Sequence, residues 1–233
     1  MKLLLQGKNF EPDIPQNEAV RYLGYRGIEP DESLLADISA CEKWVKEAAT
    51  PRFVCAGFAL QRTETALLLE DSGIALEGKS IAEHLAQSQR CLVLAATLGS
   101  GIEKLTHYMQ VSAPHMALII DACANAMIED YCDKIAAATE AETCGQNETL
   151  TWRFSPGYGD LPLEIHTRLL PVLNTGRTMG LYETKTHLLT PQKSVTALMG
   201  VIHKDTEKGK HGCEACPNYA ICNFRQGGIS CGA

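Results

Sequence analysis

One turn of the chain combines residue types that suit a small charged ligand. In the run Arg153-Phe154-Ser155-Pro156-Gly157-Tyr158-Gly159, an arginine leaves a predicted strand and offers a forked guanidinium to a carboxylate. Gly157 and Gly159 permit positive φ and a close approach of backbone to a ligand. The Tyr158 ring between them is placed to cover a flat or cationic partner. The alternative is an ordinary Pro-Gly turn with a solvated arginine, since such turns are common.

A polar stripe runs along the long helix that we predict from Pro114 to about Thr139. Asp121, Asn125 and Glu129 are spaced by four residues, so they share one face of a helix that is otherwise apolar nearly all round. Such a stripe either lines a cavity or faces solvent, and the pattern leaves both alternatives open.

Four cysteines cluster near the end of the sequence, at Cys213, Cys216, Cys222 and Cys231. The first two form a Cys-x-x-Cys motif, in which two thiolates hold one side of a metal while the later pair completes the shell. A zinc ion and a [4Fe–4S] cluster both accept four thiolates. The surrounding glycines leave this tail poor in apolar residues, so a metal would help it to fold. The alternative is a flexible, redox-active tail without metal.

Two further features are weaker. The Gly-rich turn at residues 97–101 follows an apolar strand, a place where anions bind. It lacks the full dinucleotide-binding pattern, so a structural turn is the favoured interpretation. The histidines His107, His115, His166 and His187 are scattered along the chain, and we expect them to be structural residues rather than ligands.

The composition excludes some classes of partner. The chain has 233 residues and a formal net charge of −7, which does not favour nucleic acid, because phosphate binding needs a basic field. No apolar run is long enough to span a bilayer, and the first residues lack a signal-peptide core. We therefore expect a cytoplasmic protein with no membrane partner and mostly reduced thiols. Five cysteines lie in apolar surroundings and are predicted to be small core residues: Cys41, Cys55, Cys91, Cys123 and Cys132.

Apolar patterns predict the elements that position these residues. The short, continuous apolar run 91–97 has the pattern of a buried strand. Further strands are predicted at 53–60, 66–70 and 149–154, helices at 18–26, at 31–49 and from Pro162, and a strand pair at 184–189 and 194–202 around Pro191. This mixture favours an α+β fold with a twisted, largely antiparallel sheet and flanking helices. The composition changes after His203, which predicts one domain over residues 1–202 and a Cys-rich metal-binding tail over 203–233.

The turn and two other segments resemble a known family. The pattern Arg153-x-x-x-Gly157-Tyr158-Gly159, then Asp160-x-Pro162-Leu163-Glu164, a helix and Pro191-x-Lys193-Ser194-Val195, is similar to the S-adenosylmethionine-binding region of the reactivation domain of vitamin B12-dependent methionine synthase. The run Arg21-Tyr22-Leu23-Gly24-Tyr25-Arg26-Gly27 resembles the opening of the short, stand-alone members. The resemblance extends over residues 15–202, and the tail lies outside it.

The resemblance implies a role for each candidate residue. Arg153 would hold the methionine carboxylate of S-adenosylmethionine. Gly157, Gly159 and the turn backbone would contact the ligand, and Tyr158 would lie between the ligand and a corrin ring. In the family an acidic residue on the corresponding helix contacts the ligand. Asn125 or Glu129 is nearest to that position here, and if Asn125 is the equivalent, the acidic contact is missing.

The function implied by the resemblance is reactivation of a corrinoid cofactor. The chain would bind S-adenosylmethionine and support reductive methylation of cobalamin on a partner methyltransferase or corrinoid protein, with a reductase as a further expected partner. The corrinoid would supply the nucleophile, and this chain would position the methyl donor. The tail is an addition to the family pattern; if it holds a [4Fe–4S] cluster rather than zinc, that cluster would relay the rescuing electron. Two alternatives remain open: a non-catalytic docking module with a zinc tail, and an iron–sulfur electron carrier.

Overall fold

The computed structural model describes residues 2–6, 10–25, 29–206 and 220. The strands are β1 (Lys2–Gln6), β2 (Arg52–Arg62), β3 (Leu67–Leu69), β4 (Ile74–Leu76), β5 (Arg90–Thr97), β6 (Glu148–Leu150), β7 (Tyr182–Glu183), β8 (Leu189–Thr190) and β9 (Ser194–His203). The helices are α1 (Gln16–Tyr22), α2 (Glu32–Ala48), α3 (Lys79–His84), α4 (Gly101–Ser112), α5 (Pro114–Thr143), α6 (His166–Val172) and α7 (Thr175–Met179), with a 3₁₀ turn, η1 (Leu163–Ile165), before α6.

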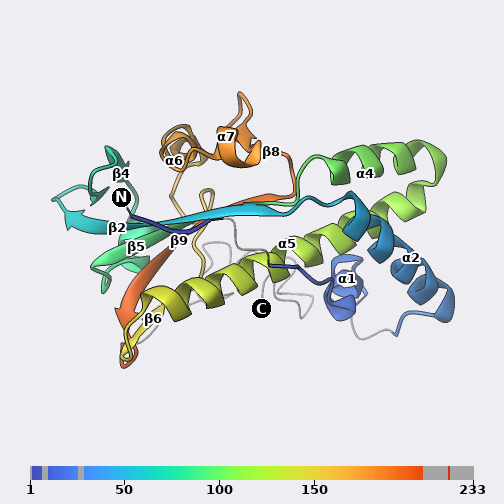
Figure 1. Ribbon diagram of the computed structural model, residues 1–233, viewed down its shortest axis with the longest axis horizontal. Helices are drawn as coiled ribbons and strands as arrows, with labels where there is room; N and C mark the ends of the chain where they lie inside the picture. Colours follow the sequence, from blue (N-terminus) through green and yellow to red (C-terminus); the bar gives the residue numbers. More distant parts are fainter. Residues whose placement is uncertain (1, 7–9, 26–28, 207–219, 221–233) are drawn as a thin grey trace.

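A seven-stranded sheet forms the centre of the fold (Figure 1). Its order is β4-β3-β2-β5-β9-β6, with β1 pairing with β2, and every pairing is antiparallel. Helix α5 runs along one face with α1 beside it, α6 and α7 lie on the other face, and α2 and α4 pack against α5 beyond the end of the sheet. The α+β fold class and the antiparallel sheet are thus confirmed.

The central strand β5 separates two apolar cores. Every residue of β5 after Arg90 is buried, as its unbroken apolar sequence predicts. Because side chains alternate between faces, Leu92 and Leu94 join the core beneath α2 and α5, whereas Cys91 and Val93 join the core beneath α6. The five cysteines predicted to be core residues are all buried.

The predicted strand pair around Pro191 is wrong. Strand β9 pairs with β5 from Ser194 to Val201, whereas β7 and β8 form a separate two-stranded hairpin. The physical reason is burial: β5 is buried on both faces and needs an apolar partner along its free edge. The run Ala197–Ile202 supplies one, but the polar residues Thr184–His187 do not.

Two element boundaries also differ from the sequence-based expectation. The first helix ends at Tyr22 rather than near Gly27, because Gly24 adopts φ 87° and reverses the chain there. The predicted strand over residues 149–154 pairs continuously with β9 only over Glu148–Leu150. It continues as an extended segment with one bridge, from Phe154 to Leu198.

Candidate functional site

The predicted ligand turn begins where this segment leaves the sheet. Phe154 exchanges both backbone hydrogen bonds with Leu198, at 3.0 and 2.8 Å, and the chain then turns away from β9. Gly157 and Gly159 have φ 91° and 55°, the positive values predicted for them. The close approach at Gly159 is to the chain itself, since a Cβ there would collide with the Ser80 side chain.

Asp160 fastens this turn to α3. Its carboxylate accepts hydrogen bonds from the backbone N–H groups of Lys79 and Ser80, at 2.6 and 2.9 Å. These bonds satisfy free donors at the first turn of the helix, and they lower the pKa of Asp160. Tyr158 is exposed, with its ring 6.0 Å from that of Phe154 in an edge-on arrangement. The turn is therefore held in place by its contacts with α3, and it presents the Tyr158 side chain to solvent.

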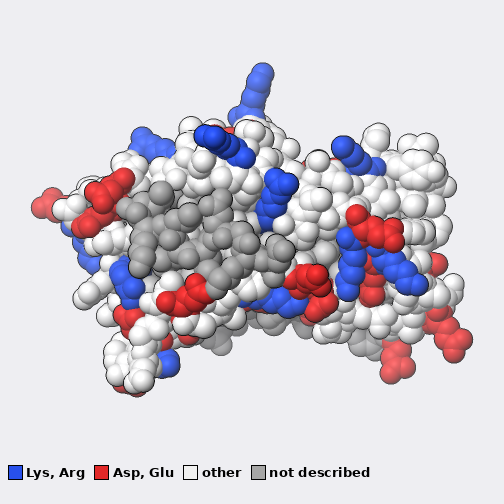
Figure 2. Space-filling view, in the orientation of Figure 1, with Lys and Arg blue, Asp and Glu red and all other residues white. Residues whose placement is uncertain are grey.

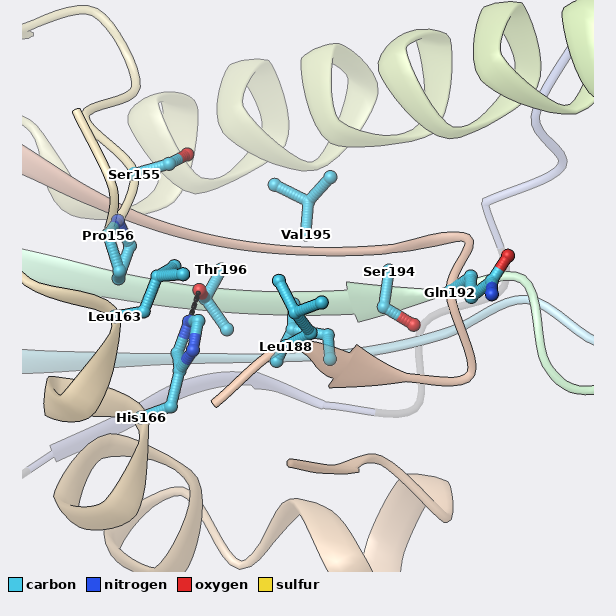
Figure 3. A pocket seen from close by; sticks show the side chains of 10 residues that line it. Ser155, Pro156, Leu163, His166, Leu188, Gln192, Ser194, Val195 and Thr196 are labelled. Carbon is cyan, nitrogen blue, oxygen red and sulfur yellow. Dashed lines mark hydrogen bonds between the residues drawn. The ribbon is translucent and has the colours of Figure 1, made fainter. Parts of the chain in front are cut away.

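A pocket opens beside the turn, at the edge of the sheet (Figure 3). It has a volume of about 430 Å³, and no Asp, Glu, Lys or Arg lines it. One wall is formed by Gln192 and the start of β9. The other wall is formed by the turn, η1, α6 and the β7–β8 hairpin. The lining residues are Ser155, Pro156, Leu163, His166, Leu188, Leu189, Gln192, Ser194, Val195 and Thr196.

The edge of β9 inside this pocket offers backbone hydrogen-bonding groups. Alternate residues of a strand direct their N–H and C=O to the same edge. Gly200 uses this edge to bond Thr151, and Leu198 uses it to bond Phe154. Thr196 comes next in the series and lines the pocket. Its N–H and C=O therefore point toward the pocket rather than toward β5.

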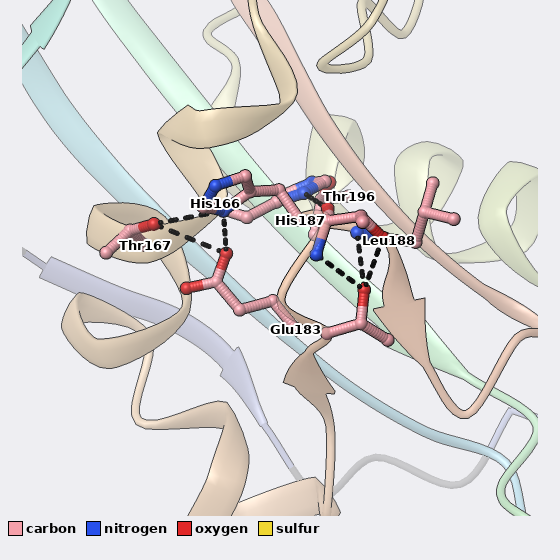
Figure 4. A network of polar contacts seen from close by, with 8 residues as sticks. His166, Thr167, Glu183, His187, Leu188 and Thr196 are labelled. Carbon is pink, nitrogen blue, oxygen red and sulfur yellow. Dashed lines mark hydrogen bonds and ion pairs between the residues drawn. The ribbon is translucent and has the colours of Figure 1, made fainter.

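A buried histidine joins the two walls (Figures 3 and 4). His166 contacts the His187 carbonyl through Nδ1 at 2.8 Å and the Thr196 hydroxyl through Nε2 at 2.7 Å. A carbonyl only accepts hydrogen bonds, so Nδ1 carries the proton and Nε2 accepts from Thr196. Burial lowers the pKa of His166, which favours this neutral form. The expectation of a structural role for His166 is consistent with these contacts.

Arg153 points to the opposite side from the hairpin, toward α5. Its Nη2 lies 2.6 Å from Glu129 and 3.0 Å from Asp133. Burial opposes the charge of Arg153, but its neighbours Cys132, Glu129 and Asp133 outweigh this effect, so the pKa of Arg153 is raised. Nη1 is buried and has no hydrogen-bond partner among the described residues. A buried donor without a partner is costly, which makes Arg153 a candidate ligand-binding residue, although it does not line the pocket itself.

Lys193 occupies the other half of the polar stripe. Its Nζ lies 2.7 Å from both Asn125 Oδ1 and Asp121 Oδ1, and Asn125 Nδ2 donates to Asp121 at 3.2 Å. The stripe therefore neither faces only solvent nor lines only a cavity. Its residues hold two cations from distant segments, Lys193 and Arg153.

These two cations are close in sequence to residues of the pocket lining, although neither lines the pocket itself. Arg153 is two residues from Ser155, and Lys193 is two residues from Val195. Both Ser155 and Val195 line the pocket, and their side chains point toward α5 (Figure 3). Sequence reasoning thus found Arg153, Asn125 and Glu129, which the fold brings to one face, but it did not predict the neutral pocket beside them.

Other features predicted from the sequence have simpler outcomes. In the Gly-rich turn after β5, a Cβ on Gly99 would meet Thr50, and one on Gly101 would meet the Ala48 carbonyl, so this turn packs closely on α2. Cys213, Cys216, Cys222 and Cys231 lie outside the described residues. Within the described ranges, no group of three or more His, Cys, Asp or Glu side chains is placed to hold a metal. None of the helices in those ranges combines the length and apolar character needed to cross a bilayer.

Comparison with known proteins tests the fold. No protein-family model matches the sequence, and no curated protein matches it. Among solved structures, the crystal structure of the MetH reactivation domain bound to AdoHcy superposes with a TM-score of 0.60, at 14% sequence identity, over 90% of this chain and 79% of that one. This chain has the MetH reactivation-domain fold. The predicted resemblance is thereby confirmed for the fold, and at this identity the likeness to the MetH domain extends no further.

Proposed function

We propose that the pocket beside the turn binds the adenosyl part of S-adenosylmethionine. The pocket volume of about 430 Å³ falls within the range of small-molecule sites. Leu163 and Leu188 offer apolar surface to a nucleoside, and the Thr196 backbone offers a donor and an acceptor to a heterocycle. The similar MetH domain was crystallised with AdoHcy, which supports a ligand of the same class here.

The amino-acid end of the ligand is assigned to the α5 side of the pocket. A zwitterion needs a cation for its carboxylate and an anion for its ammonium group. Arg153 supplies the first through Nη1, and Glu129, 2.6 Å from Nη2, supplies the second. Asn125 lies farther along α5, where it holds Lys193. The observation that carries this proposal is the buried Nη1 of Arg153 without a hydrogen-bond partner, two residues before Ser155 of the pocket lining.

The bound methyl donor would serve a corrinoid on another protein. S-adenosylmethionine supplies an electrophilic methyl group, and the reduced corrinoid of a partner methyltransferase supplies the nucleophile. This chain contributes orientation: Arg153 and the pocket hold the ligand, while Gly157, Gly159 and exposed Tyr158 lie on the turn facing the partner. A reductase would deliver the electron. Zinc or [4Fe–4S] binding by the four tail cysteines remains a prediction.

Calorimetry with two ligands tests the assignment of Arg153. S-adenosylhomocysteine carries the amino acid, and 5′-methylthioadenosine lacks it. We expect Arg153→Ala to weaken S-adenosylhomocysteine binding by about 10- to 100-fold, the value of a hydrogen bond to a charged group, and to leave methylthioadenosine binding nearly unchanged. Arg177→Ala, at an exposed position on α7, is the matched control. Absence of saturable binding by the unaltered chain would contradict the proposed function.

A methyl-transfer assay tests the reaction itself. Labelled S-adenosylmethionine is mixed with a reduced cobalamin-bearing partner, with this chain present or absent. Transfer that depends on the chain and is lost in Arg153→Ala supports a reactivase. Saturable binding without any transfer would instead support the docking module.

A further inference from the structure

A hydrogen bond between two side chains joins the walls of the pocket. The hairpin wall is formed by α6 and residues 188–189, and the strand wall by residues 192–196. His166 of the hairpin wall and Thr196 of the strand wall meet at 2.7 Å, and both are buried. Within residues 29–206, no other hydrogen bond links α6 or residues 182–190 to residues 192–196. This contact is therefore the polar link that holds the pocket at its present width.

On its other side, His166 is held by the β7–β8 hairpin (Figure 4). Its Nδ1 donates to the His187 carbonyl at 2.8 Å, and the His187 ring contacts the Glu183 carboxylate at 2.8 Å. The Thr167 hydroxyl of α6 donates to the same carboxylate at 3.3 Å. The hairpin is thus tied to α6 by two contacts, so a movement of α6 away from β9 would carry the hairpin with it.

The link to Thr196 requires an uncharged imidazole. Because Nδ1 donates to a carbonyl, Nε2 of neutral His166 accepts the proton of the Thr196 hydroxyl. A proton taken up from solvent would go to Nε2, and the ring would then offer two donors and no acceptor. The Thr196 hydroxyl would have to direct its own proton elsewhere, and a positive charge would be buried. Protonation of His166 therefore opposes the contact between the walls.

Few charges are placed to offset that proton. Lys, Arg, Asp and Glu side chains lie on the outer surface in Figure 2, whereas none lines the pocket or its β9 side. On the hairpin, Glu183 favours a charged His166 but is already paired with His187, and the His187 ring opposes the charge. Glu164 and Arg168, two residues to either side of His166, are exposed to solvent. The surroundings of the ring thus favour its neutral form.

We propose that His166 is a positioning residue that closes the pocket on its ligand only while the imidazole is neutral. Protonation releases the hairpin wall from Thr196, so the pocket widens and the nucleoside loses apolar contact with Leu188. That nucleoside is the ligand of the proposed function, on which this proposal rests. Affinity is then complete above about pH 6.5, where a histidine side chain ordinarily loses its proton, and falls at lower pH.

Calorimetry with 5′-methylthioadenosine from about pH 7.5 to about pH 5.5, a range that brackets the ordinary histidine pKa, tests the proposal. The ligand has no group that titrates there. We expect the affinity of the unaltered chain to fall about three- to tenfold over this range. His166→Gln keeps a donor and an acceptor but takes up no proton, so its affinity, lower at neutral pH, should stay level. His107→Gln, at an exposed position on α4, should follow the unaltered chain.

A His166→Gln variant whose affinity falls as steeply as that of the unaltered chain overturns the proposal. The contact between the walls can also be followed without a ligand, by nuclear magnetic resonance of the unaltered chain. A nuclear Overhauser effect between the His166 ring and the Thr196 methyl group is expected at neutral pH and should fade in step with protonation of the ring. An effect that persists on the protonated ring overturns the proposal even if the nucleoside binds. If no nucleoside binds at any pH, the proposed function fails, and this measurement still decides whether neutral His166 holds the walls together.

Discussion

The two walls of the pocket are held in different ways. The strand wall, residues 192–196, is held by three contacts: the Lys193 carbonyl accepts from the Leu98 N–H, the Lys193 ammonium binds α5, and Ser194 Oγ donates to Thr97 at 2.7 Å. The hairpin wall, formed by α6 and residues 188–189, is tied to the strand wall through His166 and Thr196. The strand wall is held in part by the charged Lys193, which binds Asp121 and Asn125 of α5. The hairpin wall is held by a neutral histidine, His166.

This difference indicates how the site accommodates a ligand. The strand wall presents backbone groups whose positions β5 and α5 determine, so it is preorganised for recognition. The hairpin wall carries Leu188, which is 55% exposed beside the pocket. Changes in the strand wall should therefore affect folding most, and changes at the tip of the hairpin wall should affect mainly binding.

Lys193→Met should have the largest effect on stability. The substitution keeps the apolar stem but removes a cation that is only 14% exposed, leaving Asp121 and Asn125 without it. Breaking a buried ion pair costs several kcal/mol, and because Asp121 is half exposed we expect a loss of about 2 kcal/mol. Urea unfolding measures this loss. Lys104→Met, at an exposed position on α4, is the control, and equal stability of the two variants would contradict the ion-pair anchor.

Thr196→Val should have the next largest effect. Valine matches threonine in shape but leaves Nε2 of buried His166 without a donor. Loss of a buried hydrogen-bond partner costs about 1–2 kcal/mol, again measured by urea unfolding. Thr196→Ser keeps the hydroxyl and is expected to lose less. A serine variant that is less stable than the valine variant would show that packing, rather than the link between the walls, dominates.

His166 should give stability a measurable pH dependence. Burial lowers its pKa below 6.5; of the neighbouring groups, the His187 carbonyl and Glu183 raise it and the His187 ring lowers it further. Below about pH 6.5 the unfolded chain therefore binds a proton that the folded chain does not, so stability falls as the pH decreases. Above that pH this contribution is complete and constant.

The free energy of unfolding measured from about pH 7 to about pH 5.5 tests this sign. We expect His166→Gln to be less stable at neutral pH and to show a shallower decline than the unaltered chain. Carboxylates elsewhere contribute equally to both proteins, so the difference in slope belongs to His166. Identical slopes would mean that the imidazole of His166 does not stay neutral in the fold.

Leu188→Ser should have the smallest effect on folding. An exposed side chain contributes little, so we expect a change of less than about 0.5 kcal/mol in stability. Binding of 5′-methylthioadenosine should nevertheless weaken several-fold, because the serine removes apolar surface from the pocket. Calorimetry measures the affinity, and Leu118→Ser, exposed on α5 and outside the pocket lining, is the control. Unchanged affinity would place the nucleoside elsewhere.

Much of the fold was predictable because its signals are local. The unbroken apolar run of β5, the long apolar pattern of α5 and the glycines of the turn each report the environment of nearby residues. The exchange of partners at β9 was not predictable in the same way. A run that suits a strand does not specify which neighbour it pairs with. The segment that forms β9 was predicted to pair with residues 184–189, but it pairs with β5, because β5 is buried on both faces and needs an apolar partner.

The sequence by itself determined the residue types of the site: a guanidinium beside a glycine-flanked aromatic turn, and a polar stripe with a spacing of four residues. Only the tertiary structure decided that Arg153 and Lys193 share this stripe, and that His166 meets Thr196 thirty residues away. The physical reason is that such contacts depend on how the strands are paired. A shift of one residue in the register of a strand would turn each of its side chains to the opposite face of the sheet.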